Sequence, residues 1–238
     1  MHYQFLTEDQ SGGLLINELM TKLQKSFPAI TFDIKTFQGI GHVPRAQTGQ
    51  NAKQIKNSKL LNSLPLYLKG FDKSLQNISA ALFIVLDNDE RDTAAFQREL
   101  NQLAWRCKIA TDCVFCIAVE EIEAWLLGDA SAIFAAYPQL FQKMRESQRK
   151  TTKKYCMTKS TCGTWLNLAE LLYRGGSEKL KKFGYPEIGI QKCEWAQRIG
   201  SCMDWNRNTS PSFQFFKDEV MKRLPQDDAP VSKAGTSL

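Results

Sequence analysis

The segment that most constrains the fold of this chain is a run of apolar residues that ends abruptly in acids. Residues 80–86 are all apolar, and Asp87, Asn88 and Asp89 follow directly. A short run of this kind predicts a strand that is buried on both faces. Residues two apart in an extended chain point to the same side, so we expect Asp87 and Asp89 to share one region. Such close carboxylates favour a bound cation between them, and oxygen ligands of this type suit Mg²⁺ or Mn²⁺.

Strand-like and helical patterns alternate through the first half of the chain. The expected strands cover residues 2–6, 30–37, 80–86 and 113–119. The expected helices include residues 14–23, 52–75 with an interruption near Pro65, 93–105 and 120–127. Strands separated by helices predict an α/β fold with a mostly parallel sheet flanked by helices. Sheets of this class bind their ligands at the carboxyl ends of the strands.

The second half of the chain has a different pattern, which is helical and rich in loops. The clearest helix is expected at residues 164–173, and no linker-like composition separates this half from the first. We therefore expect a C-terminal helical extension packed on the sheet domain rather than an independent domain. The predicted division is a sheet domain at residues 1–130, the extension at 131–226 and a flexible polar tail at 227–238.

Acidic residues follow three of the predicted strands. Glu8 comes after the first strand, and Asp87 and Asp89 come after the third. We expect Glu8 to be a metal ligand or the base that takes a proton from water, with Asp87 and Asp89 holding the principal ion. The alternative for the aspartates is a capped turn, with Asp92 capping the next helix.

A third acidic group follows the fourth strand. Glu120 and Glu123 are three residues apart, so they would share one face of the predicted helix, whereas Glu121 would point elsewhere. Glu120 or Glu123 could therefore complete a second metal position. The alternative is that these glutamates only stabilise the positive end of a helix.

Carboxylates gathered without histidine or a cysteine nucleophile suit metal-assisted phosphoryl transfer, in which divalent ions activate water and stabilise the leaving oxygen. The chain of 238 residues has only two histidines, so histidine-based catalysis is not expected. It contains no Gly-x-x-x-x-Gly-Lys motif, which argues against ATP hydrolysis. Gly12 and Gly13 could still bind a phosphate at the start of the first helix.

Charge and cysteine content indicate the environment and the partners. The net charge is +6, and residues 143–159 hold seven basic residues against one acid, which suits either a phosphate-binding surface or a solvated helix face. Seven cysteines without regular spacing indicate a reducing compartment, and we expect Cys113 and Cys116 to pack in the core. Neither a leader peptide nor a membrane-length apolar run is visible, so we expect a cytoplasmic protein with no membrane partner.

The order of the acids resembles that of the Toprim domain of topoisomerases, primases and OLD-type nucleases. The resemblance rests on Glu8 after the first strand, Asp87-x-Asp89 after the third and a later acid, and it covers about residues 1–129. Over nearly the whole chain, the sequence is similar to small stand-alone Toprim-like proteins of a domain-of-unknown-function family. The matching segments are residues 6–12, 123–129, 208–213 and the Lys192-x-x-Trp-Ala segment.

The resemblance implies a Toprim/Rossmann-like fold and a Mg²⁺-dependent nuclease site. It assigns Glu8, Asp87 and Asp89 as metal acids, Glu123 as an accessory acid, and Lys192 as a cation that stabilises charge on the phosphate. It further implies nucleic acid as the substrate, an ABC-type ATPase as a partner protein, and a role in defence against phage or mobile DNA.

Other functions stay open at the level of sequence. An apolar strand followed by Asp-x-Asp also occurs in nucleotide-sugar transferases, although that function leaves Glu8 unexplained. An aspartyl phosphatase is a weaker alternative because Glu90 and Arg91 follow the motif. A catalytically silent Toprim-like scaffold that binds an ATPase or nucleic acid is the non-enzymatic alternative. DNA and RNA are not distinguished, since three aromatic residues could stack on bases or lie in the core: Trp165, Tyr173 and Trp195.

Overall fold

A computed structural model describes residues 1–44, 59–119, 121–142, 144–158 and 163–225. The first half of the chain forms four parallel strands in the order β2-β1-β3-β4. The strands are β1 (His2–Thr7), β2 (Thr31–Thr36), β3 (Ala80–Asp87) and β4 (Asp112–Ala118). The predicted α/β fold with a parallel, helix-flanked sheet is confirmed.

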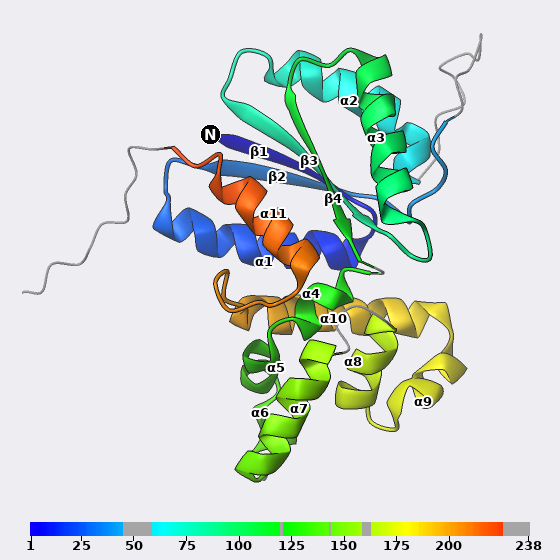
Figure 1. Ribbon diagram of the computed structural model, residues 1–238, viewed down its shortest axis with the longest axis vertical. Helices are drawn as coiled ribbons and strands as arrows, with labels where there is room; N and C mark the ends of the chain where they lie inside the picture. The colour runs from blue at the N-terminus through cyan, green and yellow to red at the C-terminus, as the bar shows by residue number, and fades with distance from the viewer. Residues whose placement is uncertain (45–58, 120, 143, 159–162, 226–238) are drawn as a thin grey trace, which may run out of the picture.

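Helices cover both faces of this sheet (Figure 1). On one face lie α2 (Leu60–Leu75) and α3 (Thr93–Cys107), and on the other lie α1 (Gln10–Ser26) and α11 (Pro211–Met221). The uniformly apolar β3 follows from this arrangement, because its successive side chains enter different cores. Phe83 and Val85 belong to the core beneath α1 and α11, while Leu82 and Ile84 belong to the core beneath α2 and α3.

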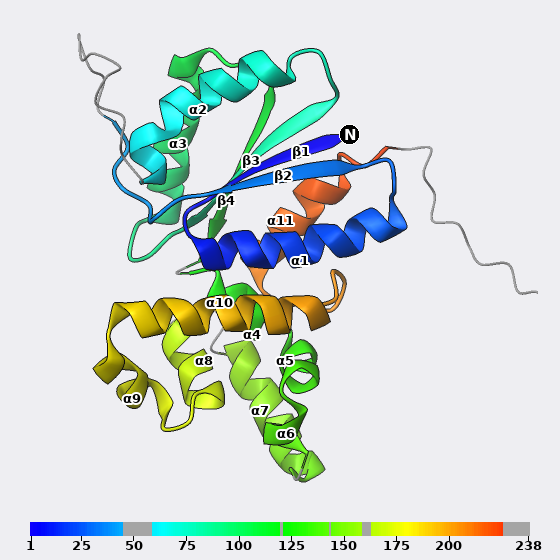
Figure 2. The same ribbon diagram turned by 180° about the vertical axis from the view of Figure 1, so that it is seen from behind.

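The remaining helices form a second lobe below the sheet, seen from both sides in Figures 1 and 2. They are α4 (Glu123–Leu127), α5 (Ala130–Ala136), α6 (Pro138–Phe141), α7 (Glu146–Thr158), α8 (Thr164–Leu172), α9 (Gly176–Phe183) and α10 (Tyr185–Cys202). Helix α10 runs alongside α1 and joins the lobe to the sheet layer, and one continuous hydrophobic core extends through both.

The C-terminal helix α11 returns from this lobe to the sheet. The Tyr3 hydroxyl of β1 donates a hydrogen bond to the Val220 carbonyl at 3.0 Å, and the Phe216 ring lies 6.3 Å from that of Phe5. The two ends of the chain therefore stabilise one core. The predicted tail at 227–238 lies outside the described residues.

The structure contradicts the break expected near Pro65 and confirms that Cys113 and Cys116 pack against the core. The helix expected to break near Pro65 is continuous from Leu60 to Leu75, although Pro65 lies inside it and cannot donate the usual hydrogen bond to the Leu61 carbonyl. Cys113 and Cys116 contact opposite cores of the sheet, as alternation along a strand requires. Neither thiol can share a metal with the other. None of the described helices has the length and apolar character needed to cross a membrane.

Candidate metal centre

The candidate site lies at the carboxyl edge of the sheet, where β1, β3 and the loop after β4 meet. Asp87 is the last residue of β3, and its Oδ1 accepts a hydrogen bond from the Ile122 backbone N–H at 2.9 Å. The Asp87 N–H donates to Oε2 of Glu8 at 3.1 Å. The Asn88 N–H donates to the Ala118 carbonyl at 2.9 Å, which ties the ends of β3 and β4 together. These bonds fix Asp87 between the neighbouring strand ends.

Three carboxylates converge at this edge. Asp87, Glu121 and Glu123 each contribute one oxygen to a set whose members all lie within 4.8 Å of one another. Glu123 has no exposed surface, and Lys192 of α10 contacts it, with Nζ 3.1 Å from Oε2. The same Nζ lies 3.2 Å from Oε1 of Glu121. Apart from this ammonium, no hydrogen-bond donor among the described residues meets the Glu123 carboxylate.

The electrostatics of the group favour an added cation. Burial raises the pKa of Glu123 to about 7, even though Lys192 acts in the opposite direction. Burial and the neighbouring Glu8 carboxylate raise the pKa of Asp87 well above its usual range. Burial disfavours the Lys192 ammonium as well, yet the carboxylates of Glu123 and Glu121 outweigh it and raise its pKa. One lysine therefore does not fully compensate the three acids, and the oxygen-only set fits a hard divalent cation.

Glu8 lies beside the group without belonging to it. Burial is the main cause that raises its pKa to about 7, and the hydrogen bond from the Asp87 N–H opposes this rise. A carboxyl that titrates near neutrality can exchange a proton at working pH, which is the property of a general base. The structure thus brings together four of the predicted site residues, Glu8, Asp87, Glu123 and Lys192.

Asp89 departs from the expected geometry. Strand β3 ends at Asp87, and Asp89 adopts a left-handed backbone conformation with φ of 50°, so the spacing rule for extended chain no longer applies. Its exposed carboxylate forms an ion pair with Arg91 at 2.8 Å and is absent from the described three-carboxylate group. Asp87 and Asp89 therefore do not form a joint chelate in this structure. Asp92 caps α3 by accepting a hydrogen bond from the Ala95 N–H. This is the role that the capped-turn alternative predicts for Asp92.

Glu121 was expected to point away, and this expectation is wrong. The helix begins only at Glu123, so Glu121 lies in the preceding turn. Helical spacing therefore does not determine where its side chain points. Oε2 of Glu121 accepts hydrogen bonds from the Thr164 hydroxyl at 3.1 Å and from the Trp165 N–H at 3.4 Å. In the sequence, the feature that could have pointed to Glu121 as a member of the site is its position just after a predicted strand, next to other acids. Glu120, the other predicted ligand, lies outside the described residues.

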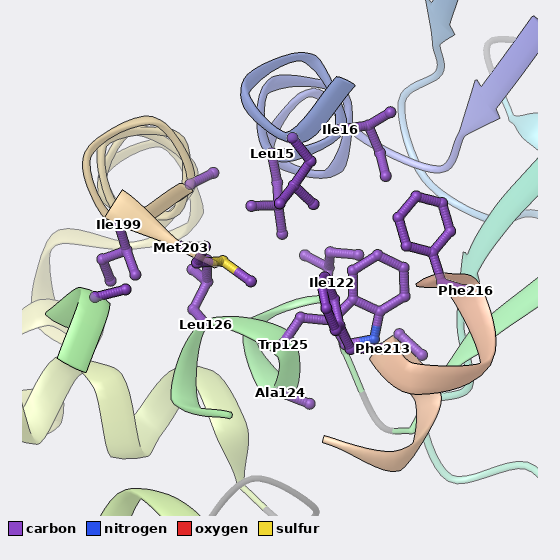
Figure 3. Packing of buried hydrophobic residues seen from close by; sticks show 14 of the residues in the cluster. Leu15, Ile16, Ile122, Ala124, Trp125, Leu126, Ile199, Met203, Phe213 and Phe216 are labelled. Atoms are coloured by element: carbon purple, nitrogen blue, oxygen red, sulfur yellow. The ribbon is translucent and has the colours of Figure 1, made fainter. Parts of the chain in front are cut away.

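The short helix α4, which carries Glu123, is held by the segment before α11. The Asn208 amide donates to the Trp125 carbonyl at 2.6 Å, and Trp125 Nε1 donates to the Ser212 hydroxyl at 3.0 Å. Figure 3 shows Trp125 packed beside Phe213 and Phe216, below α1. The segment before α11 and the start of α11 therefore position the helix that carries the buried Glu123, through packing and hydrogen bonds.

The glycine pair and the basic stretch have less direct relations to the site. Asp9 caps α1 and accepts from the Gly12 N–H at 2.8 Å, so this donor is already used within the helix cap.

The described basic residues of the stretch 143–159 lie on α7 or just before it, in the lower lobe, and Lys143 and Lys159 lie outside the described residues. Trp195 is a core residue at 1% exposure, whereas Trp165 and Tyr173 are half-buried.

A hollow of about 560 Å³ opens beside the acidic group. It is lined by Asp89, Glu90, Arg91, Glu121, Gly163 and Trp165. Glu121 thus belongs both to the carboxylate group and to the wall of the hollow, whereas Asp87 and Glu123 do not line it.

Comparisons of the chain with protein-family models, with curated proteins and with solved structures found no match.

Proposed function

We propose that this protein is a divalent-metal-dependent nuclease that hydrolyses phosphodiester bonds in DNA or RNA. The observation that carries the proposal is the convergence of Asp87, Glu121 and the fully buried Glu123 at the carboxyl edge of a parallel sheet. Sheets of this class place their active sites at that edge. The resemblance to Toprim-like nucleases, through Glu8, Asp87 and the later acid Glu123, supports the same chemistry.

Asp87, Glu121 and Glu123 are the residues that would hold Mg²⁺ or Mn²⁺. The bound ion would supply Lewis-acid stabilisation of the phosphate and a lower pKa for a water molecule. Glu8, whose pKa burial raises to about 7, would accept the proton of the attacking water. Lys192 keeps a positive charge next to the carboxylates and offsets part of their repulsion toward a phosphate.

The ion pairs of Lys192 favour one second candidate, a catalytically silent scaffold. In that case the lysine alone neutralises Glu121 and Glu123, and the domain binds nucleic acid or an ATPase without cleavage. An ABC-type ATPase partner and a role in defence against phage or mobile DNA follow from the resemblance and belong to the proposal. The nucleotide-sugar transferase has less support, because Asp87 and Asp89 do not converge in the structure.

The test is cleavage of plasmid, single-stranded DNA and tRNA by the purified protein with Mg²⁺, Mn²⁺ or a chelator. We expect cleavage only with a divalent ion, and its loss in Asp87→Asn and Glu123→Gln. Glu99→Gln is the control, because Glu99 is exposed on α3. Titration calorimetry with Mn²⁺ is run on the same variants. Equal metal binding by wild type and Asp87→Asn, or cleavage that resists the chelator, contradicts the proposed function.

A further inference from the structure

We infer that the hollow beside the acidic group binds an unpaired nucleotide of single-stranded DNA or RNA, with its base stacked on Trp165. This inference rests on the proposed function, because the acidic group supplies the site for the adjacent phosphodiester. It names the class of substrate that the sequence leaves open.

The first argument is the direct link between Trp165 and the metal ligands. Thr164 and Trp165 begin α8, and the Thr164 hydroxyl and the Trp165 backbone N–H both donate hydrogen bonds to Oε2 of Glu121. The other oxygen of Glu121 accepts from Lys192, beside Glu123. An aromatic residue is therefore attached, through one glutamate, to the position where a metal-bound phosphate would lie. A base and its own phosphate are separated by only a sugar, so both can be contacted together.

The second argument is the size and charge of the hollow. Its volume of about 560 Å³ lies within the range of about 300–1,000 Å³ that is usual for small-ligand sites. Its wall holds one guanidinium, of Arg91, and three carboxylates, of Asp89, Glu90 and Glu121. A phosphate there would therefore be held by the guanidinium together with the divalent ion of the proposed site. In the structure this guanidinium is 2.8 Å from the exposed Asp89 carboxylate, so a phosphate would compete with an exposed and weakly held partner. The Gly163 backbone, with no side chain, forms part of the same wall.

The third argument concerns the state of the strand. Bases in a duplex are already paired and stacked, and they do not offer a free face to a side chain. Sequence-tolerant binding of single strands uses aromatic side chains on which bases stack, with cations along the backbone. Trp165 is half-buried and lines the hollow, in contrast to the core residue Trp195. This combination favours an unpaired strand.

The experiment measures binding separately from cleavage. Fluorescein-labelled oligo(dT), oligo(U) and a blunt duplex of equal length are titrated with the full-length Glu123→Gln protein in Mg²⁺, and gels verify that the probes stay intact. We expect both single strands to bind more tightly than the duplex. Adding Trp165→Ala should weaken single-strand binding about 5- to 150-fold, the equivalent of one lost base stack. Trp165→Phe should stay within about threefold, since an aromatic face remains. Trp105→Ala is the matched control, because Trp105 is 81% exposed on α3 and does not line the hollow.

A second measurement does not depend on the stability of the alanine variant. The five tryptophans are labelled as 5-fluorotryptophan, and the Trp165 resonance is assigned from Trp165→Phe. Oligo(dT) should shift the Trp165 resonance and leave that of Trp105 in place. Equal affinity for duplex and single strands, or an unmoved Trp165 resonance on binding, overturns the inference. Single-strand binding through Trp165 without any metal-dependent cleavage by wild type contradicts only the proposed function. Equal cleavage of single-stranded and duplex substrates contradicts only the inference.

Discussion

The ammonium nitrogen of Lys192 lies 3.1 Å from Oε2 of Glu123, whose side chain has no exposed surface. The pair connects α10 to the short helix α4 at the carboxyl edge of the sheet. The contribution of this pair to the free energy of unfolding can be measured on the metal-free protein without an assay of activity. A divalent ion bound to the same carboxylates would neutralise part of their charge.

Lys192→Met should destabilise the metal-free protein at pH 8 by about 3–5 kcal/mol, because it leaves buried carboxylates without their counter-ion. Urea denaturation measures the loss. Lys181→Met is the control, since Lys181 forms an exposed ion pair with Glu178 and should cost less than about 1 kcal/mol. Mg²⁺ should raise the melting temperature of Lys192→Met more than that of wild type. Similar losses in the two variants would show that the buried pair has no special role.

Glu121→Gln should lower the affinity for Mn²⁺ tenfold or more, about 1.4 kcal/mol, because it removes one of the three converging carboxylates. The amide oxygen can still accept from Thr164, so the turn should stay intact. The matched control is Glu90→Gln, an exposed acid on the wall of the same hollow. Calorimetry distinguishes the variants. An equal loss in both would indicate a general charge effect instead of direct ligation.

The stability of the metal-free protein should fall as pH rises from about 4.5 to about 7. Burial raises the pKa of Glu8 and Glu123 from 4.5 to about 7, so the folded state holds more protons than the unfolded state in this interval. Stability that depends on such protons is complete below the unfolded pKa and is lost as pH passes the folded pKa. Melting temperatures across this range should decline for wild type and decline less for Glu123→Gln. Parallel curves for the two proteins would refute the assignment. Affinity for Mn²⁺ should rise over the same interval as the acids lose their protons.

Asp129→Ala should cost about 2–4 kcal/mol, because Asp129 combines a helix cap with buried charged hydrogen bonds. Its carboxylate accepts from the Ala132 N–H at 3.0 Å, the Asp204 N–H at 3.1 Å and Arg207 Nε at 2.8 Å, and the residue is 1% exposed. Asp129→Asn keeps an oxygen for the cap and should lose less. Urea denaturation compares the two, and a loss below about 0.5 kcal/mol in the alanine variant would contradict the structural role.

Gly13→Ala should destabilise the fold by about 1–3 kcal/mol, because a Cβ there would lie 2.3 Å from the Thr36 methyl group. The close approach of α1 to β2 therefore explains this glycine without a phosphate. Gly70→Ala in α2 is the matched control, since nothing lies within 4 Å of its Cβ position. It should be neutral or stabilise by about 0.5–1 kcal/mol through helix propensity. Denaturation curves in which Gly13→Ala matches Gly70→Ala would contradict the packing argument.

The parallel sheet could be predicted from the sequence because its signals are local. An unbroken apolar run such as 80–86 is stable only where helices cover both faces, and the structure provides two separate cores for its alternating side chains. The position of Asp87 at the carboxyl edge followed from the same reasoning, since the change from apolar to polar residues marks the end of the strand in the sequence.

The membership of the acidic group was decided by tertiary structure. Whether Glu121 or Asp89 joins Asp87 depends on where α4 begins and on one left-handed residue, and neither follows from periodicity. Lys192 reaches the group because α10 packs along α1 and beside α4, many residues away in sequence. The sequence by itself determined a sheet edge rich in carboxylates. The long-range packing of the helical lobe determined which of them converge, because it brings the Lys192 ammonium next to carboxylates that otherwise repel one another.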